Sequence, residues 1–268
     1  MRAVRSIIVA LACTIWAAPA LAAGCQTGSF EAWLETFKRE TAAKGVSPRG
    51  LAALDGVAYD ASVVSRDRRQ GVFRQSFEEF SGRMISPDRL RVGARKLKQH
   101  AATFARIEQA YGVPGPVLVA IWGLETDFGV NQGNFSVIRA LASLGYDCRR
   151  SEKFQAELMD ALRIVERGDL SPHEMRGAWA GEIGQTQFLP SSYLKYAVDF
   201  DGDGRRDLIR SVPDALASTA NYLRGYGWKR GQGWEPGAAN FDVLLQWNKS
   251  QVYSKTIAAF ATRLQEAR

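Results

Sequence analysis

Glu125 is the one charged residue at a buried-looking position in an unusually apolar stretch, VLVAIWGLETDFG at 117–129. Apolar residues occupy almost every side of this stretch at helical spacing, which predicts a helix buried all round. Burial of Glu125, and its place in the last helical turn before Gly129, both disfavour the carboxylate and raise its pKa. Such a carboxyl can act as a general acid near neutral pH, as in glycosidases. The alternative is a buried glutamate satisfied by an arginine or by backbone amides.

A second stretch, GAWAGEIGQTQFLP at 177–190, combines glycine, glutamine and aromatic residues. Its glycines would weaken a helix and allow the backbone to approach an extended polar ligand. Gln185 and Gln187 can hydrogen-bond sugar hydroxyls and acetamido groups, and Trp179 and Phe188 offer flat faces to pyranose rings. A glycine-rich corner packed on the core explains the same residues without a ligand.

A third stretch, DFDGDGRRD at 199–207, has the beginning of an EF-hand calcium loop. Its carboxylates occupy positions 1, 3, 5 and 9, and Gly204 at position 6 permits the sharp turn. The twelfth position is Arg210, where the standard loop has a bidentate acid, but Asp214 could close a longer loop over 199–214. Helices predicted over 191–197 and 213–226 would flank it. The alternative is an Asp/Gly turn without metal. The candidate ligands are Asp199, Asp201, Asp203, the Arg205 carbonyl and Asp214.

The chain resembles the membrane-bound lytic transglycosylase B family of peptidoglycan-cleaving enzymes in three motifs that occur in the same order. They are ETDFG at 125–129, GEIGQTQFLPSSY at 181–193 and the Asp-rich loop. The resemblance covers about residues 30–260. It implies a lysozyme-like α core in which Glu125 is the sole catalytic acid and base. Glu125 would protonate the oxygen between N-acetylmuramic acid and N-acetylglucosamine, then take a proton from the muramoyl C6 hydroxyl to close a 1,6-anhydro ring without water. Catalysis would need no cofactor, and calcium would be structural.

The resemblance also implies substrate contacts, and this chain departs from the family pattern at three positions. Ala178 replaces a common Ser, Glu182 falls within a motif that is commonly Gly-Ala-Met-Gly, and Trp247 replaces a Tyr. Two other functions stay open: a lysozyme-like hydrolase that uses Glu182 or Asp127 as its second acid, and a silent peptidoglycan-binding module. The implied substrate-binding residues are Gln187, Phe188, Tyr222, Trp247, Asn248 and Tyr253.

The elements that must position these residues are helices, because apolar residues recur mostly at intervals of three and four. We expect a mainly α fold with a lysozyme-like core over 116–268 and an additional N-terminal helical lobe over 24–115, separated by the Val113-Pro-Gly-Pro116 break. A capping box at 171–174 predicts a further helix start. Other helices are predicted over Phe30–Ala43, from Ser86-Pro87 to Tyr111, over Ser136–Leu144 and over Ser151–Arg167.

Residues 1–23 read as a secretory signal peptide, with Arg2 and Arg5 before an apolar run and a small-residue cleavage site. Its removal takes away Cys13 and leaves Cys25 and Cys148, an even pair that predicts a disulfide in an oxidising compartment. We expect a periplasmic protein. The alternative is an outer-membrane lipoprotein anchored through Cys25.

The charge and composition of the chain limit the classes of molecule that it is expected to bind. The whole chain has a net charge of +7 from 35 Lys+Arg and 28 Asp+Glu, and loss of the two signal-peptide arginines leaves 33 minus 28, or +5. This modest excess, without a basic run, suits acidic envelope glycan and peptide and does not favour nucleic acid. The two histidines show no zinc spacing, which argues against a metallohydrolase. We expect a monomer that binds peptidoglycan strands, with envelope protein complexes as further candidate partners.

Overall fold

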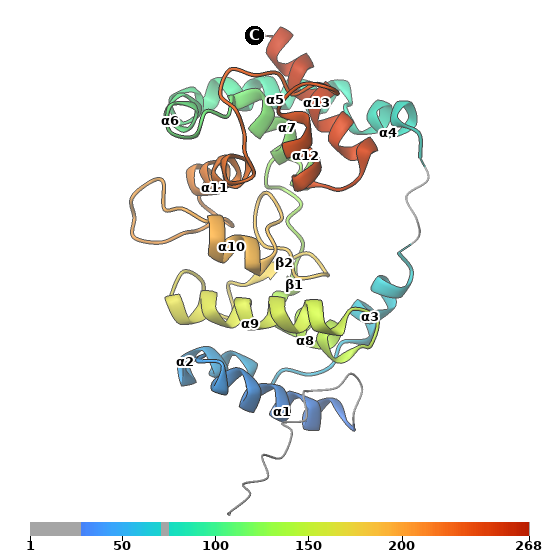
Figure 1. Cartoon of the computed structure of the whole chain (residues 1–268), viewed down its shortest axis with the longest axis vertical. Helices are drawn as coiled ribbons and strands as arrows, with labels where there is room; N and C mark the ends of the chain where they lie inside the picture. The colour runs from blue at the N-terminus through green and yellow to red at the C-terminus, as the bar shows by residue number, and fades with distance from the viewer. Residues whose placement is uncertain (1–27, 71–74, 268) are drawn as a thin grey trace, which may run out of the picture.

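The computed structural model describes residues 28–70 and 75–267, and within them the chain is predominantly helical (Figure 1). Two short strands, β1 (Phe135–Ser136) and β2 (Arg176–Gly177), pair antiparallel with Phe135 opposite Gly177. The helices are α1 (Phe30–Ala43), α2 (Pro48–Leu51), the 3₁₀ helix η1 (Ala52–Leu54), α3 (Ala61–Arg68), α4 (Phe77–Met84), α5 (Pro87–Gln99), α6 (Ala101–Tyr111), α7 (Gly115–Thr126), α8 (Val137–Tyr146), α9 (Ser151–Arg167), α10 (Pro190–Tyr196), α11 (Val212–Gly225), α12 (Phe241–Trp247) and α13 (Gln251–Glu266).

The first of two hydrophobic cores lies where α1 and α2 pack beneath α8 and α9, at the lower end of Figure 1. Helix α1 has the bounds predicted from its apolar spacing, and Ser29 caps it by accepting a hydrogen bond from the Ala32 N–H over 3.2 Å. Its aromatic face, led by Trp33 and Phe37, is buried against α8 and α9. This core holds the wall of the cavity described below.

The second core surrounds α7, whose apolar residues are buried on every side, as its sequence predicts. Helices α5, α6, α11 and α13 pack around it at the upper end of Figure 1. The described helices before residue 115 therefore contribute to both cores, α1 to α3 to the first and α4 to α6 to the second. Tyr222 and Trp247 pack against both cores and so mark the seam between them.

The single helix predicted from Ser86-Pro87 to Tyr111 is wrong, because the chain breaks at His100. His100 has φ −110° and ψ 25°, ends α5 and begins α6. Its ring packs edge-on against Trp122 of α7 at 5.9 Å between centroids. Leu97 in α5 and Phe104 in α6, on either side of the break, both belong to the second core.

The helix start predicted at 171–174 is also wrong, although its capping interactions form. Glu174 Oε2 accepts the Ser171 N–H over 2.8 Å, and Ser171 Oγ accepts the Glu174 N–H over 3.4 Å. The segment is a turn because the next residues pair elsewhere: the Met175 carbonyl accepts the Val137 N–H and β2 joins β1. Helices α9, α10 and α11 occupy the positions predicted for them.

The expected signal peptide over 1–23 and Cys25, with its predicted disulfide and its alternative lipid anchor, lie outside the described residues. Cys148 follows α8 in an exposed turn. Across 28–70 and 75–267, we find no helix that combines the length and the apolar character needed to span a membrane.

Candidate active site

Glu125 lies in the last turn of α7, which ends in an unusual turn. Asp127, Phe128 and Gly129 all have positive φ, at 51°, 61° and 87°. The two non-glycine residues are strained there, and such strain persists only where surrounding contacts enforce it. Arg89 Nε donates to Asp127 Oδ1 over 2.8 Å and Asn131 Nδ2 donates to Asp127 Oδ2 over 2.9 Å. The turn thus fixes the end of the helix that carries Glu125.

The Glu125 carboxyl is buried and receives two hydrogen bonds on the same oxygen. Trp247 Nε1–H and the Tyr253 hydroxyl each donate to Oε1 over 2.9 Å. Burial raises the pKa of Glu125 to about 7, the two donors pull that pKa down, and the nearby charge of Glu182 raises it. At neutral pH the group is therefore close to half protonated, as a group that both gives and takes a proton requires.

The same two donors determine which oxygen carries the proton. An N–H and an O–H both point at Oε1, so a hydrogen on Oε1 would face them. No residue in the described part of the chain donates to Oε2. The acidic proton therefore belongs on Oε2, and Glu125 lines a cavity with this carboxyl group.

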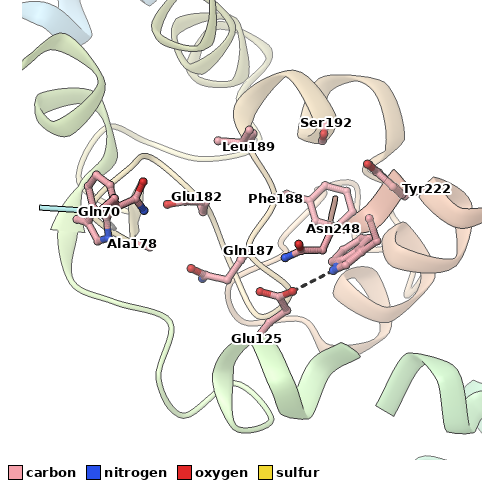
Figure 2. A pocket seen from close by; sticks show the side chains of 12 residues that line it. Gln70, Glu125, Ala178, Glu182, Gln187, Phe188, Leu189, Ser192, Tyr222 and Asn248 are labelled. Atoms are coloured by element: carbon pink, nitrogen blue, oxygen red, sulfur yellow. Dashed lines mark hydrogen bonds between the residues drawn. The ribbon is translucent and has the colours of Figure 1, made fainter. Parts of the chain in front are cut away.

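The cavity has a volume of about 370 Å³ and lies between the two cores (Figure 2). Figure 2 shows Gln187 between Glu125 and Glu182, with Tyr222 and Asn248 on the opposite side. The lining residues come from the segment after α3, from α7, from α10 and the segment before it, from α11 and from the end of α12. They are Gln70, Glu125, Ala178, Trp179, Glu182, Gln187, Phe188, Leu189, Ser192, Tyr222, Trp247 and Asn248.

The glycine-rich segment forms one wall through a tight hairpin. Ile183 and Phe188 exchange backbone hydrogen bonds of 2.7 and 2.9 Å, and Gln187 at the turn has φ 57°. The Gln187 amide donates to the Gly184 carbonyl over 2.9 Å. A Cβ at Gly184 would lie 2.3 Å from the Leu208 carbonyl, so glycine is required there by close backbone packing. Thr126 Oγ1 donates to the Gln185 carbonyl over 2.6 Å and ties this wall to α7.

Aromatic rings extend this wall from Phe188 towards Tyr222 and Trp247. The rings of Phe188 and Trp247 meet edge to face with centroids 5.6 Å apart, and those of Tyr222 and Trp247 at 5.0 Å. The Tyr222 hydroxyl donates to the Gln246 carbonyl over 2.9 Å, which fixes the ring against α12. These contacts hold the indole of Trp247 where its N–H reaches Glu125.

The structure brings together the residues that the sequence singles out. Five of the six expected substrate-binding residues line the cavity, and Tyr253 contacts Glu125 without lining it. Gln185, expected beside Gln187 on the sugar, is instead buried, and its amide donates to the Ile209 carbonyl. Asp127 is held by Arg89 outside the cavity lining. Sequence reasoning missed Gln70, which follows α3 and has no motif around it.

The Asp-rich loop carries a cluster of three carboxylates. Ligand atoms of Asp199, Asp201 and Asp214 lie within 4.8 Å of one another. Asp214 is buried and accepts the N–H groups of Phe200 and Asp207 over 2.7 and 2.9 Å. Burial raises the pKa of Asp214, and the charge of Asp201 adds to this rise.

Asp203 and Arg205, which also belong to the expected ligand set, make other contacts. The Asp203 carboxylate accepts the Arg205 N–H over 2.8 Å and is not part of the three-residue cluster. The Arg205 guanidinium reaches the Asp169 carbonyl over 2.9 Å. Arg210, at the twelfth position, pairs with Asp207 and Glu174. The loop therefore has a converging acidic set of the kind that hard cations prefer, closed by Asp214.

Comparisons with known proteins agree with this geometry. Residues 29–239 match a family model described as the transglycosylase SLT domain. Membrane-bound lytic murein transglycosylase B of Escherichia coli (strain K12) is 38% identical over 182 residues, which cover 68% of this chain and 49% of that protein. The chain thus spans about half the length of this relative.

Solved structures are similar over a larger share of their chains. SltB3 from Pseudomonas aeruginosa in complex with NAG-anhNAM-pentapeptide matches with a TM-score of 0.84 and 33% identity, over 89% of this chain and 80% of that one. The Escherichia coli lytic transglycosylase Slt35 in complex with calcium matches with a TM-score of 0.78 and 26% identity, over 88% and 93%. The expected fold class, mainly α with a lysozyme-like core, is confirmed.

Proposed function

Because the chain belongs to the transglycosylase SLT domain family, we propose that it is a lytic transglycosylase that cleaves the β-1,4 bond between MurNAc and GlcNAc in peptidoglycan and leaves 1,6-anhydro-MurNAc ends. The observation that carries the proposal is Glu125: a buried carboxyl with a pKa of about 7 at the edge of a cavity walled by aromatic and amide side chains.

In the proposed reaction Glu125 acts twice. Its Oε2 hydrogen passes to the glycosidic oxygen as the bond to the muramoyl C1 breaks, and the carboxylate that remains is stabilised by Trp247 and Tyr253 at Oε1. Glu125 then takes the proton of the muramoyl C6 hydroxyl while the C6 oxygen bonds to C1. One proton enters and one leaves, so Glu125 is restored and no water is consumed.

Two observations support this reaction over hydrolysis by a carboxyl pair. Asp127, one of the candidate second acids, is held by Arg89 and does not line the cavity. The complex of SltB3 contains a NAG-anhNAM-pentapeptide, a molecule with the anhydro end that such a reaction produces. Gln187, Phe188, Tyr222, Trp247 and Asn248 are the proposed sugar-binding residues, since all five line the cavity beside Glu125.

Mass spectrometry of digested peptidoglycan tests the proposal. Transglycosylation yields fragments with anhydro ends, and hydrolysis yields fragments heavier by one water. Glu125→Gln should lose activity by at least ~100-fold, because the amide cannot cycle a proton. Glu152→Gln, an exposed glutamate on α9, is the matched control and should keep full activity. Hydrated products would support the hydrolase alternative, and strand binding without turnover by the unaltered protein would support the silent binding module.

The Asp-rich loop is proposed to bind a structural calcium ion. Asp199, Asp201 and Asp214 would hold it, with the Arg205 carbonyl as a further expected ligand. Asp203, whose carboxylate is not part of the cluster, would require a local rearrangement of its turn. When bound, the ion supplies charge neutralisation that lets three close carboxylates stay ionised. The loop follows α10, so its order would support the wall that contains Gln187 and Phe188. The proposed catalytic steps use no metal.

Location and assembly are proposed on the same basis. We expect export to the periplasm after cleavage at residue 23, a Cys25 to Cys148 disulfide, and a monomer acting on glycan strands. The relative in Escherichia coli is described as membrane-bound. The alternative to a free periplasmic protein is therefore a protein anchored to a membrane by a lipid on Cys25. The mass of the mature N-terminal peptide separates the two, because a lipid anchor adds a diacylglyceryl group to Cys25.

A further inference from the structure

Glu182 is a second carboxyl group in the cavity, and the proposed reaction does not use it. It stands on the side away from Tyr222, beyond Gln187 from Glu125 (Figure 2). Its backbone is fixed, because the Glu182 carbonyl accepts the Ala178 N–H over 2.9 Å and a Cβ at Gly177 would lie 1.9 Å from that carbonyl oxygen. The side chain therefore enters the cavity from a rigid support.

One oxygen of the Glu182 carboxylate lacks the hydrogen-bond partners that other buried acids of this fold have. Its Oε2 is buried and accepts no hydrogen bond from the described residues. By contrast, the Glu157 carboxylate accepts the Ser191 N–H and hydroxyl over 2.9 and 2.8 Å, and Asp67 is paired with Arg149 and Arg150. Burial raises the pKa of Glu182, and the backbone N–H groups of Glu182 and Ala180, followed by the charges of Lys153 and Arg150, only partly oppose that rise. A buried acceptor of this kind gains most from a donor supplied by a ligand.

The charge of the cavity favours a particular donor. Its lining includes two carboxylic acids, Glu125 and Glu182, and no lysine or arginine. Lys153 and Arg150 lie near Glu182 but outside the lining, and Arg150 is engaged by Asp67. A cavity with acidic groups and low-dielectric walls attracts a cation. The Trp179 ring, also in the lining, offers a face that suits a cation as well.

We propose that Glu182 is a specificity-determining residue that binds a primary ammonium group of the substrate through Oε2. This inference rests on the proposed function, since it places the ammonium group on a glycan in the same cleft. The group can come from an amino sugar without its acetyl group or from a free amine of a stem peptide. Both sources present the same chemistry, a charged N–H donor facing a carboxylate.

Binding measured without turnover tests this inference independently of the reaction. In a Glu125→Gln background, calorimetry would give Kd for glycan strands that are fully N-acetylated, chemically de-N-acetylated, or peptide-bearing with the amine free or acetylated. Adding Glu182→Gln should weaken binding of at least one amine-bearing ligand by about tenfold or more and change binding of its acetylated counterpart by less than about twofold. The ligand affected identifies the source of the amine.

Equal effects of Glu182→Gln on amine-bearing and acetylated ligands, or no effect on any, would overturn the proposal. Glu182→Ala is the second variant, since the resembling family commonly has alanine in this motif, and Glu152→Gln is the surface control. Melting temperatures within a few degrees of the parent would show that the fold is retained. Failure of the unaltered protein to form anhydro products would reject the proposed function while leaving these binding comparisons interpretable.

Discussion

The Tyr253 hydroxyl donates to Glu125 Oε1 over 2.9 Å across 128 positions of sequence. Burial and the neighbouring Glu125 raise the pKa of Tyr253 well above its ordinary value, so the phenol keeps its hydrogen throughout the range in which Glu125 titrates. Tyr253 is thus a constant donor to a group that changes charge. It favours the carboxylate form and offsets part of the burial that favours the acid.

Activity should fall as pH rises through about 7, because Glu125 must carry a proton in order to protonate the glycosidic oxygen. Above this point kcat/KM for glycan cleavage should decline about tenfold per pH unit, as for the loss of a single required proton. A profile of initial rates from pH 5 to 9 measures it. A flat profile between pH 6 and 9 would contradict the pKa that the structure gives Glu125.

Tyr253→Phe should move this decline to higher pH, since it removes one of the two donors that lower the pKa of Glu125. The maximum rate should drop as well, because the carboxylate formed after the first proton transfer loses a hydrogen bond. The same pH profile provides both readouts. Tyr111→Phe, on α6 and outside the cavity lining, is the matched control and should leave the profile where it was.

Glu125→Gln should stabilise the fold at alkaline pH. The folded pKa of about 7 lies above the ordinary value of 4.5, so the folded state binds more protons between these values and its free energy of unfolding falls as pH rises through this window. The glutamine of the variant does not titrate, so the free energy of unfolding of the variant should exceed that of the unaltered protein by about 3 kcal/mol above pH 8 and should equal it below pH 4. Thermal unfolding of both proteins at pH 4 and 8 measures the difference, and equal shifts at both pH values would argue against a raised pKa.

Calcium should raise the melting temperature of the mature protein. An ion that binds only the folded state adds about 2.7 kcal/mol at a hundredfold excess over its Kd. Asp201→Ala should abolish the rise, because Asp201 belongs to the carboxylate cluster, and Asp203→Ala tests whether the turn rearranges to add a ligand. Melting curves in excess chelator and in millimolar calcium or magnesium provide the measurement. Identical melting curves in chelator, calcium and magnesium would show that the loop is an acidic turn that binds no metal ion.

The mature protein should contain no titratable thiol until it is reduced, if Cys25 and Cys148 are bridged. The bridge would close a long loop and add about 4 kcal/mol through the entropy of the unfolded chain. Thiol titration of the denatured protein before and after reduction counts the free groups. Two thiols before reduction would exclude the bridge, and Cys148→Ser would then leave the melting temperature unchanged.

Local patterns predicted the elements well and their ends less well. The apolar surface of α7 and the spacing in α1 and α9 identified these helices, because the residues that face a core are apolar and recur every third or fourth position. The break at His100 has no glycine or proline to signal it, and the contact of the His100 ring with Trp122 joins two helices, which a local pattern does not reveal. At 171–174 the capping box formed without a helix because strand pairing of the following residues prevailed, which a local pattern cannot reveal.

The site was predictable where residues share a motif and unpredictable where they meet only in space. Glu125 and Gln187 stand in recognisable segments, and both reach the cavity. Gln70 joins the lining from the end of α3, and no property of its neighbours distinguishes it. The location of the Glu125 proton on Oε2 depends on two donors more than a hundred residues away, so it could not be read from the apolar helix alone.

The donors to Glu125 come from the end of α12 and from α13, the last helix of the fold, beyond the 29–239 segment that matches the family model. Helix α7 itself is enclosed by α13, so the acid gains both its burial and its hydrogen bonds only when residues 247–266 are in place. Removal of residues 247–266 would therefore take away both donors to the Glu125 carboxyl and the α13 side of its enclosure.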